Sequence, residues 1–156
     1  MLQRIQSVYL TLVFVFAVLF VFLPLGKFDY EGIKIALKIT GLEFPAQAPL
    51  QISPGWRSIL LIVLAFGIMV LTVFSVFQYK RRRYQIQLGK LNILMHVGLV
   101  VSAFFFIDNY QENLVNLPFN YGIGIFLPLV SMILILMANK AIKRDEELVR
   151  STDRIR

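Results

Sequence analysis

The sequence predicts an all-α membrane protein, in which four transmembrane helices pack as an up-down bundle with both termini in the cytoplasm. Three observations lead to this fold class. The chain of 156 residues is 58% hydrophobic and only 16% charged, whereas a soluble domain carries about 25% charged residues. Four long stretches are almost free of charge. Lys and Arg residues gather in alternate segments between those stretches, as they do in membrane proteins.

Each apolar stretch is long enough to cross a bilayer as a helix. The predicted spans cover residues 8–25, 58–79, 91–107 and 121–138. A hydrocarbon core about 30 Å thick requires roughly 20 helical residues, with a range of about 17–25. The first span exceeds the apolar region of a cleaved signal peptide, which is about 7–15 residues long. We therefore expect it to be retained as a helix.

The distribution of basic residues predicts the orientation. Basic residues favour the cytoplasmic side of a membrane, and 12 of the 16 Lys and Arg residues lie before the first span, in the loop 80–90 or in the tail 139–156. The loops 26–57 and 108–120 are therefore expected outside. The same basic residues favour contact with anionic headgroups rather than any specific nucleic acid. The residues that carry this signal are Arg4, Lys80, Arg81, Arg82, Arg83 and Lys90.

The first outer loop predicts a small extracytoplasmic β-hairpin. Apolar and polar residues alternate over 33–40, a period typical of a half-buried strand. Residues 28–30 alternate too, and Glu31-Gly32 between the two runs is a plausible hairpin turn. Gly41 is expected to end the strand. In the fourth span, Pro128 is expected to kink the helix or to loosen one of its turns.

The predicted spans contain few polar or ionisable side chains. The intramembrane polar candidates are Asn92, His96 and Ser102. Intramembrane ionisable groups are functional hypotheses, but no second His, Asp or Glu lies in any span, so no proton relay or metal shell can be assembled. His96 is expected to be neutral and hydrogen-bonded near Asn92. We predict no catalytic, cofactor-binding or metal-binding residue, and hence no enzyme.

The tail 139–156 predicts an amphipathic cytoplasmic helix that continues the fourth span. The spacing of Lys143 with Glu147, and of Glu146 with Arg150, predicts ion pairs one turn apart. Two roles remain open for this helix. It either lies on the anionic inner leaflet or under its own bundle, or it serves as a docking element for a partner.

Two terminal motifs resemble a known family. MLQRIQSVYL at residues 1–10 and NKAIKRDEELVRSTDRIR at residues 139–156 are similar to the ends of small four-helix inner-membrane proteins of Bacteroidota, a family of unknown function. The resemblance implies a bacterial cytoplasmic membrane protein and carries over no catalytic residue. The matched residues that we take as docking candidates are Gln3, Gln6, Lys143, Arg144, Asp145, Glu146, Leu148, Val149, Arg150, Asp153 and Arg154.

These observations favour a non-enzymatic accessory or scaffold subunit of a larger membrane complex, such as a translocation or envelope-secretion machine. The expected partners are anionic membrane lipids and other membrane proteins or a second copy of the chain. One alternative is a small transporter or channel that uses the bundle interior near His96 and Pro128. Another is a homo-oligomeric protein that organises lipids.

Overall fold

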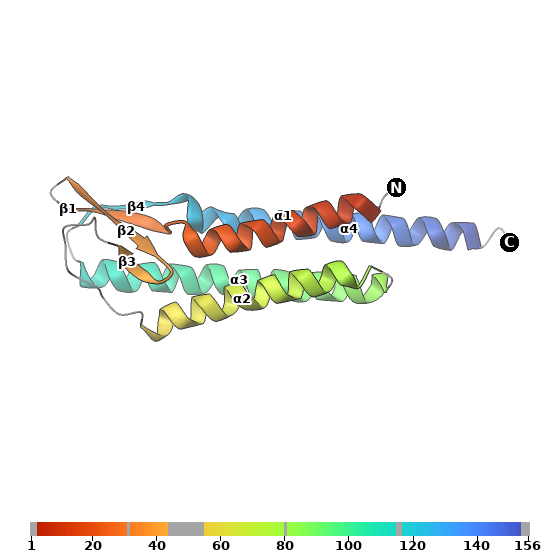
Figure 1. Ribbon diagram of the computed structural model, residues 1–156, viewed down its shortest axis with the longest axis horizontal. Coiled ribbons are helices and arrows are strands. Elements are labelled where there is room, and N and C mark those ends of the chain that lie inside the picture. The colour runs from red at the N-terminus through yellow and green to blue at the C-terminus, as the bar shows by residue number, and fades with distance from the viewer. Residues whose placement is uncertain (1–2, 31, 44–54, 80, 115–116, 154–156) are drawn as a thin grey trace.

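Four long helices dominate the computed structural model, which describes residues 3–30, 32–43, 55–79, 81–114 and 117–153. They run along a common long axis, and a small sheet lies at one end (Figure 1). By length and composition, each of the four is long and apolar enough to cross a membrane. The predicted four-helix architecture is thus confirmed. The helices are α1 (Gln3–Phe22), α2 (Trp56–Phe77), α3 (Arg82–Asn113) and α4 (Leu127–Asp153).

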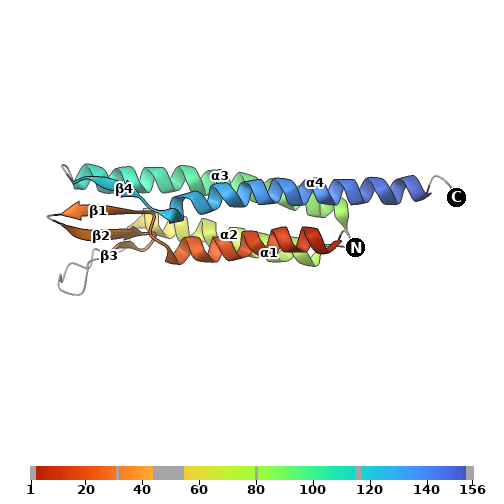
Figure 2. The ribbon, with the colours of Figure 1, turned by 90° about the horizontal axis from the view of Figure 1, so that it is seen from above.

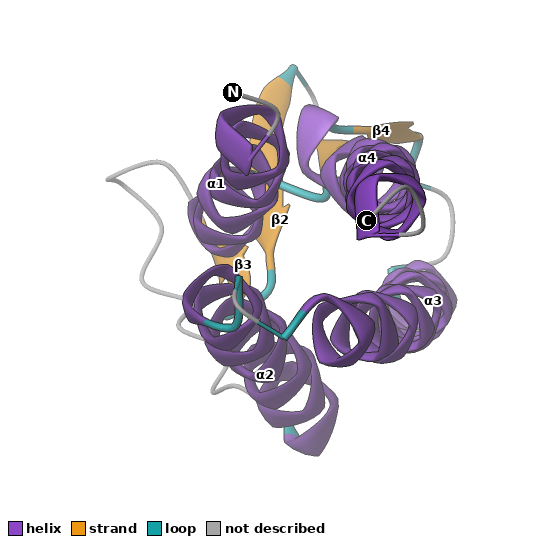
Figure 3. Cartoon of the chain, turned by 90° about the vertical axis from the view of Figure 1, so that its right-hand side faces the viewer, coloured by secondary structure: helices purple, strands orange, loops and turns teal. Residues whose placement is uncertain are grey.

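The helices form a closed ring in which each packs against its neighbour in sequence and α4 returns beside α1 (Figure 3). Each helix buries one stripe. On α2 the stripe includes Leu61, Ala65, Ile68, Thr72 and Ser75, which recur every three or four residues. That spacing places side chains on one face of an α-helix. The other faces of the helices carry large apolar side chains outward.

The sheet is antiparallel and has the strand order β3-β2-β1-β4. The predicted hairpin is confirmed as β1 and β2, and Gly32 adopts φ 83° in its turn, a conformation that glycine accepts without steric cost. The strand ends at Lys38, earlier than expected, and Gly41, which has φ 126°, begins a third strand. The four strands are β1 (Gly26–Tyr30), β2 (Ile33–Lys38), β3 (Gly41–Glu43) and β4 (Phe119–Tyr121).

One face of the sheet shares a core with the ends of the helices. Phe28 and Leu37 are fully buried and belong to the same apolar cluster as Phe106 of α3. The ring centroids of Phe28 and of Phe119 on β4 lie 4.7 Å apart, and this aromatic contact stabilises the edge strand against the hairpin. The opposite face is polar and carries the ion pair of Lys38 with Glu43, 2.6 Å apart. The sheet therefore caps the bundle.

Two connections hold the sheet against the helices. The link from α1 to β1 accepts hydrogen bonds from the link between β4 and α4, which contains the 3₁₀ turn η1 (Ile123–Phe126). The amide of Gly122 donates to the carbonyl of Leu25 at 2.8 Å, and that of Gly124 donates to the carbonyl of Pro24 at 3.1 Å. These bonds satisfy backbone groups that would otherwise be buried without a partner.

The helix ends differ from the predicted spans. Residues 23–25 are not helical, because Pro24 has no amide hydrogen and disfavours a helical residue before it. Residues 82–90, assigned to a loop by the sequence analysis, form the first turns of α3. They include Gln, Leu, Arg and Lys, which are good helix formers. An apolar stretch marks only the part of a helix that suits a hydrocarbon environment. Its length therefore underestimates the length of a helix whose ends are polar.

The expected kink at Pro128 is wrong. The fourth helix begins at Leu127, not at residue 121, and the preceding residues form β4 and η1. Pro128 is therefore the second residue of α4. The first amides of a helix have no partner within it, so proline is tolerated there without a lost hydrogen bond.

The contact between the two links gives a stability prediction. A Cβ at position 124 would lie 2.7 Å from the carbonyl oxygen of Pro24 and 3.0 Å from its carbon, whereas a Cβ at Gly98 meets nothing within 4 Å. Gly124→Ala should destabilise the fold by about 1–3 kcal/mol through overpacking. Gly98→Ala should be neutral or stabilising by up to about 1 kcal/mol, because alanine favours a helix. Thermal unfolding in detergent measures the melting temperatures of the two variants. Equal melting temperatures would contradict the close contact between Gly124 and Pro24.

Candidate functional site

The described topology and docking candidates lie at the end of the bundle opposite the sheet. The start of α1, the α2–α3 connection and the second half of α4 all lie there (Figures 1 and 2). We call this the turn end: residues 3–10, 78–79, 81–90 and 139–153. Lys80 and Arg154 lie outside the described residues. For five others only the helical backbone is described: Gln3, Arg4, Val149, Arg150 and Asp153.

Two ion pairs join the start of α3 to α4. The Nη2 atom of Arg82 lies 3.0 Å from Oδ2 of Asp145, and its Nη1 donates to the Asp145 carbonyl at 3.2 Å. The Nε atom of Arg83 donates to Oε1 of Glu146 at 3.3 Å. The first pair is the better shielded, because the side chains of Arg82 and Asp145 are only 23% and 14% exposed. We call these two contacts the arginine clamp.

The clamp unites residues that the sequence analysis assigned to different roles. Arg82 and Arg83 were topology signals, and Asp145 and Glu146 were docking candidates. Each pair is separated by 63 residues, so only tertiary packing brings them together. The helical spacing was a poor guide here: within the described chain Lys143 and Glu147 form no ion pair, and Glu146 pairs with Arg83.

One surface of α4 remains open beside the clamp. Ile142 is buried in the bundle, whereas Lys143, Arg144, Glu147 and Leu148 are exposed. We call these four residues the tail surface. Leu148 is 49% exposed. It belongs to the part of the chain where α4 extends beyond the other three helices (Figures 1 and 2). Arg81 and Lys90 on the α3 side are exposed as well.

Gln6 does not face outward. It shares the buried stripe of α1 with Leu10, Val13 and Ala17, so its side chain points into the bundle and cannot contact a partner. Its Nε2 atom has no hydrogen-bond partner in the described structure, and neither has Oε1 of the buried Gln85. Sequence reasoning missed Gln85, although its spacing from Asn92 by two helical turns is a usable signal.

The intramembrane candidates separate into two groups. The buried Asn92 donates through Nδ2 to the hydroxyl of Thr72 at 2.8 Å, and that hydroxyl donates to the carbonyl of Ile68 at 2.7 Å. His96 donates through Nδ1 to the carbonyl of Asn92 at 2.8 Å. Ser102 lies apart, beside a shallow hollow of about 220 Å³ with Trp56. The bonds of Asn92 and His96 join adjacent turns and neighbouring helices, as structural hydrogen bonds do.

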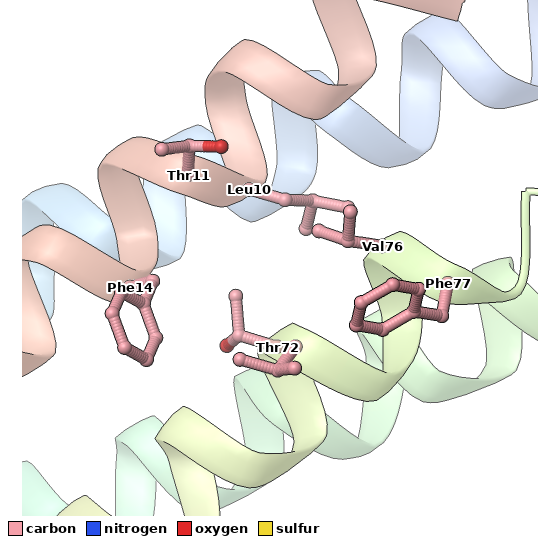
Figure 4. Close-up of a pocket in the computed structure, with 7 residues that line it drawn as sticks. Leu10, Thr11, Phe14, Thr72, Val76 and Phe77 are labelled. Carbon is pink, nitrogen blue, oxygen red and sulfur yellow. The ribbon is translucent and has the colours of Figure 1, made fainter.

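An apolar groove runs between α1 and α2 (Figure 4). It consists of two adjoining hollows of about 180 and 410 Å³. Its position depends on how the helices cross, so sequence periodicity could not locate it; the signal in hindsight is the aromatic series on α2. The lining residues are Leu10, Thr11, Phe14, Phe66, Met69, Val70, Thr72, Val73, Phe74, Val76 and Phe77.

The arrangement defines a capped four-helix bundle with a charged, clamped end. Within the described residues no group of three or more His, Cys, Asp or Glu side chains could hold a metal ion. The chain belongs to the family described as "Domain of unknown function (DUF4293)", whose family model matches residues 2–155. No curated protein and no solved structure matches the chain.

The clamp predicts an energetic coupling across the turn end. In a double-mutant cycle, Arg82→Ala and Asp145→Ala should be less than additive, with a coupling of about 0.5–1 kcal/mol for a partly shielded ion pair. The matched cycle of Arg81→Ala with Glu147→Ala should show none, because these residues form no ion pair with each other. Chemical denaturation in detergent measures both. Additive effects in the first cycle would contradict the clamp.

Proposed function

We propose that the protein is a non-enzymatic membrane protein that spans the bilayer four times and acts as an accessory subunit of a larger membrane complex. The tail surface of α4 is the proposed contact with the partner. One observation carries this proposal: the arginine clamp fixes the base of the tail, while Lys143, Arg144, Glu147 and Leu148 remain exposed beside it. A tail that served only to close the bundle would bury its apolar side chain.

The outward faces of the helices support membrane insertion. Large apolar side chains lie there, among them Phe66, Leu94 and Phe105, each about two-thirds exposed. Soluble monomers rarely expose apolar patches larger than a few hundred Å². In a bilayer the same surface contacts hydrocarbon, and the helices satisfy their backbone hydrogen bonds internally, as a membrane requires.

The charge distribution supports the orientation. The turn end carries Arg81, Arg82, Arg83 and Lys90 together with the basic residues of α4, and positive residues favour the cytoplasmic side. Both termini would then be cytoplasmic, and the sheet would lie outside. In a bacterium this membrane would be the cytoplasmic membrane.

The bundle interior favours the accessory role over transport. Transport sites usually contain polar groups near the midplane or broken helices. Here the polar side chains of Asn92 and Thr72 bond to each other, and His96 bonds within its own helix. Pro128 lies in the first turn of α4 and leaves the helix unbroken. These hydrogen bonds are internal to the bundle, although Oδ1 of Asn92, Nε2 of Gln6 and Oε1 of Gln85 have no partner among the described residues.

The orientation predicts a labelling pattern. The chain has no cysteine, so single cysteines can be introduced without background. Ala36→Cys, on the polar face of β2, should react in intact cells with a thiol reagent that cannot cross the membrane. Glu147→Cys should react only after the cells are permeabilised. The reverse pattern would overturn the orientation, and equal labelling of both would contradict insertion.

The docking role predicts a partner that depends on the tail surface. Leu148→Asp combined with Lys143→Glu and Arg144→Glu reverses the surface but leaves the clamp residues Asp145 and Glu146 in place. A partner recovered with the native chain in mild detergent should be lost from this variant, because apolar contact and charge both change. Mass spectrometry of material purified at native expression measures the loss.

The matched control is Lys90→Glu, which reverses an exposed charge at the same end but outside α4. It should retain the partner. Equal recovery of the partner with the native chain, the triple variant and Lys90→Glu would contradict the tail surface as the contact. Recovery of the protein with no other protein would favour self-association. Thermal unfolding of each variant in detergent verifies that the fold is kept.

A further inference from the structure

We infer that the groove between α1 and α2 is a binding site for one anionic phospholipid, with an acyl chain in the groove and the headgroup phosphate at Arg81. This inference rests on the membrane insertion proposed above and adds a ligand to it. Four observations support it: the lining of the groove, its length, the size of its side chains and the basic residue that follows the end of α2.

The lining accepts hydrocarbon. Phe14, Phe74 and Phe77 line it together with valines and a methionine. Thr72 is its only buried polar side chain, but its hydroxyl already accepts from Asn92 and donates to the carbonyl of Ile68. It therefore offers little to a polar occupant. Apart from the exposed Thr11 of α1, the lining offers an occupant burial of apolar surface.

The length matches one leaflet. On α2 the groove extends from Phe66 to Phe77, which is about 16 Å at a helical rise of 1.5 Å per residue. Half of a hydrocarbon core about 30 Å thick is about 15 Å. The groove reaches the end of α2 beside the turn end, so its depth corresponds to the leaflet on that side of the bundle.

The side chains favour a lipid over a partner helix. Membrane helices approach each other through Gly, Ala, Ser and Thr, which let the backbones come close. The groove instead has large aromatic walls, with Phe66 and Phe77 66% and 73% exposed. A flexible acyl chain fits between such side chains, whereas a second helix would be held away by them.

A basic residue follows the end of α2 that the groove reaches, and the amide of Arg81 donates to the carbonyl of Gln78 at 2.9 Å. Arg81 follows Phe77 by four residues, is exposed, and pairs with no carboxylate in the described part of the chain. Its neighbours Arg82 and Arg83 are held by the clamp, so among these three arginines Arg81 is the one outside an ion pair in the described residues.

The test is native mass spectrometry of the purified full chain, with dioleoyl phosphatidylglycerol or dioleoyl phosphatidylcholine added in detergent. The native chain should retain phosphatidylglycerol in preference. Arg81→Ala should reduce that retention about fivefold, the effect expected for one basic residue at an anionic lipid. Val73→Trp should fill the groove and remove retention of both lipids. Lys90→Ala and Val101→Trp, matched changes outside the groove, should behave like the native chain.

Equal retention of the two lipids, or native retention by Val73→Trp, would overturn the site. A photo-reactive residue at position 73 that captures a protein instead of lipid would also overturn it and assign the groove to a helix. Failure of the membrane proposal is distinguishable, because the chain would then leave the membrane in an alkaline wash. The tail-surface variants change residues outside the groove, so a lost protein partner in those variants neither supports nor contradicts lipid binding in the groove.

Discussion

Packing of the four helices along their buried stripes is the constraint on which the other features depend. Once Leu61, Ile68 and their counterparts face inward, the rotation of each helix is set, and so are the groups that meet at its ends. At one end this places Phe106 of α3 in the same apolar cluster as the hairpin residue Phe28. At the other it brings the start of α3 beside α4, where the arginine clamp forms.

The two ends of the bundle therefore differ in kind. The sheet end is closed by a shared apolar core and by hydrogen bonds between the two links at Pro24 and Gly124. The turn end is held by charge, and it leaves α4 projecting with exposed Lys143, Arg144 and Leu148. A stable cap at one end and an open charged surface at the other suit a subunit that is anchored in the bilayer and contacts partners on one side.

Most of the helical fold could be predicted from the sequence, because apolar length and the period of the hairpin are local signals. The strands β3 and β4 could not, since each has three residues and β4 pairs with β1 from a distant part of the chain. Pro128 was misassigned because its effect depends on its position in the helix. At the site, the charges were visible in sequence, but the pairing of Arg82 with Asp145, the burial of Gln6 and the groove all arise from helix packing.

The central claim is that the tail surface contacts another protein. In-cell photo-crosslinking from position 148, where Leu148 is 49% exposed, tests it most directly, with position 101 on an outward face of α3 as the reference. The account predicts one discrete foreign protein captured from position 148 and only lipid from position 101. Capture of lipid alone from position 148 would contradict the account and make the tail a membrane-surface helix.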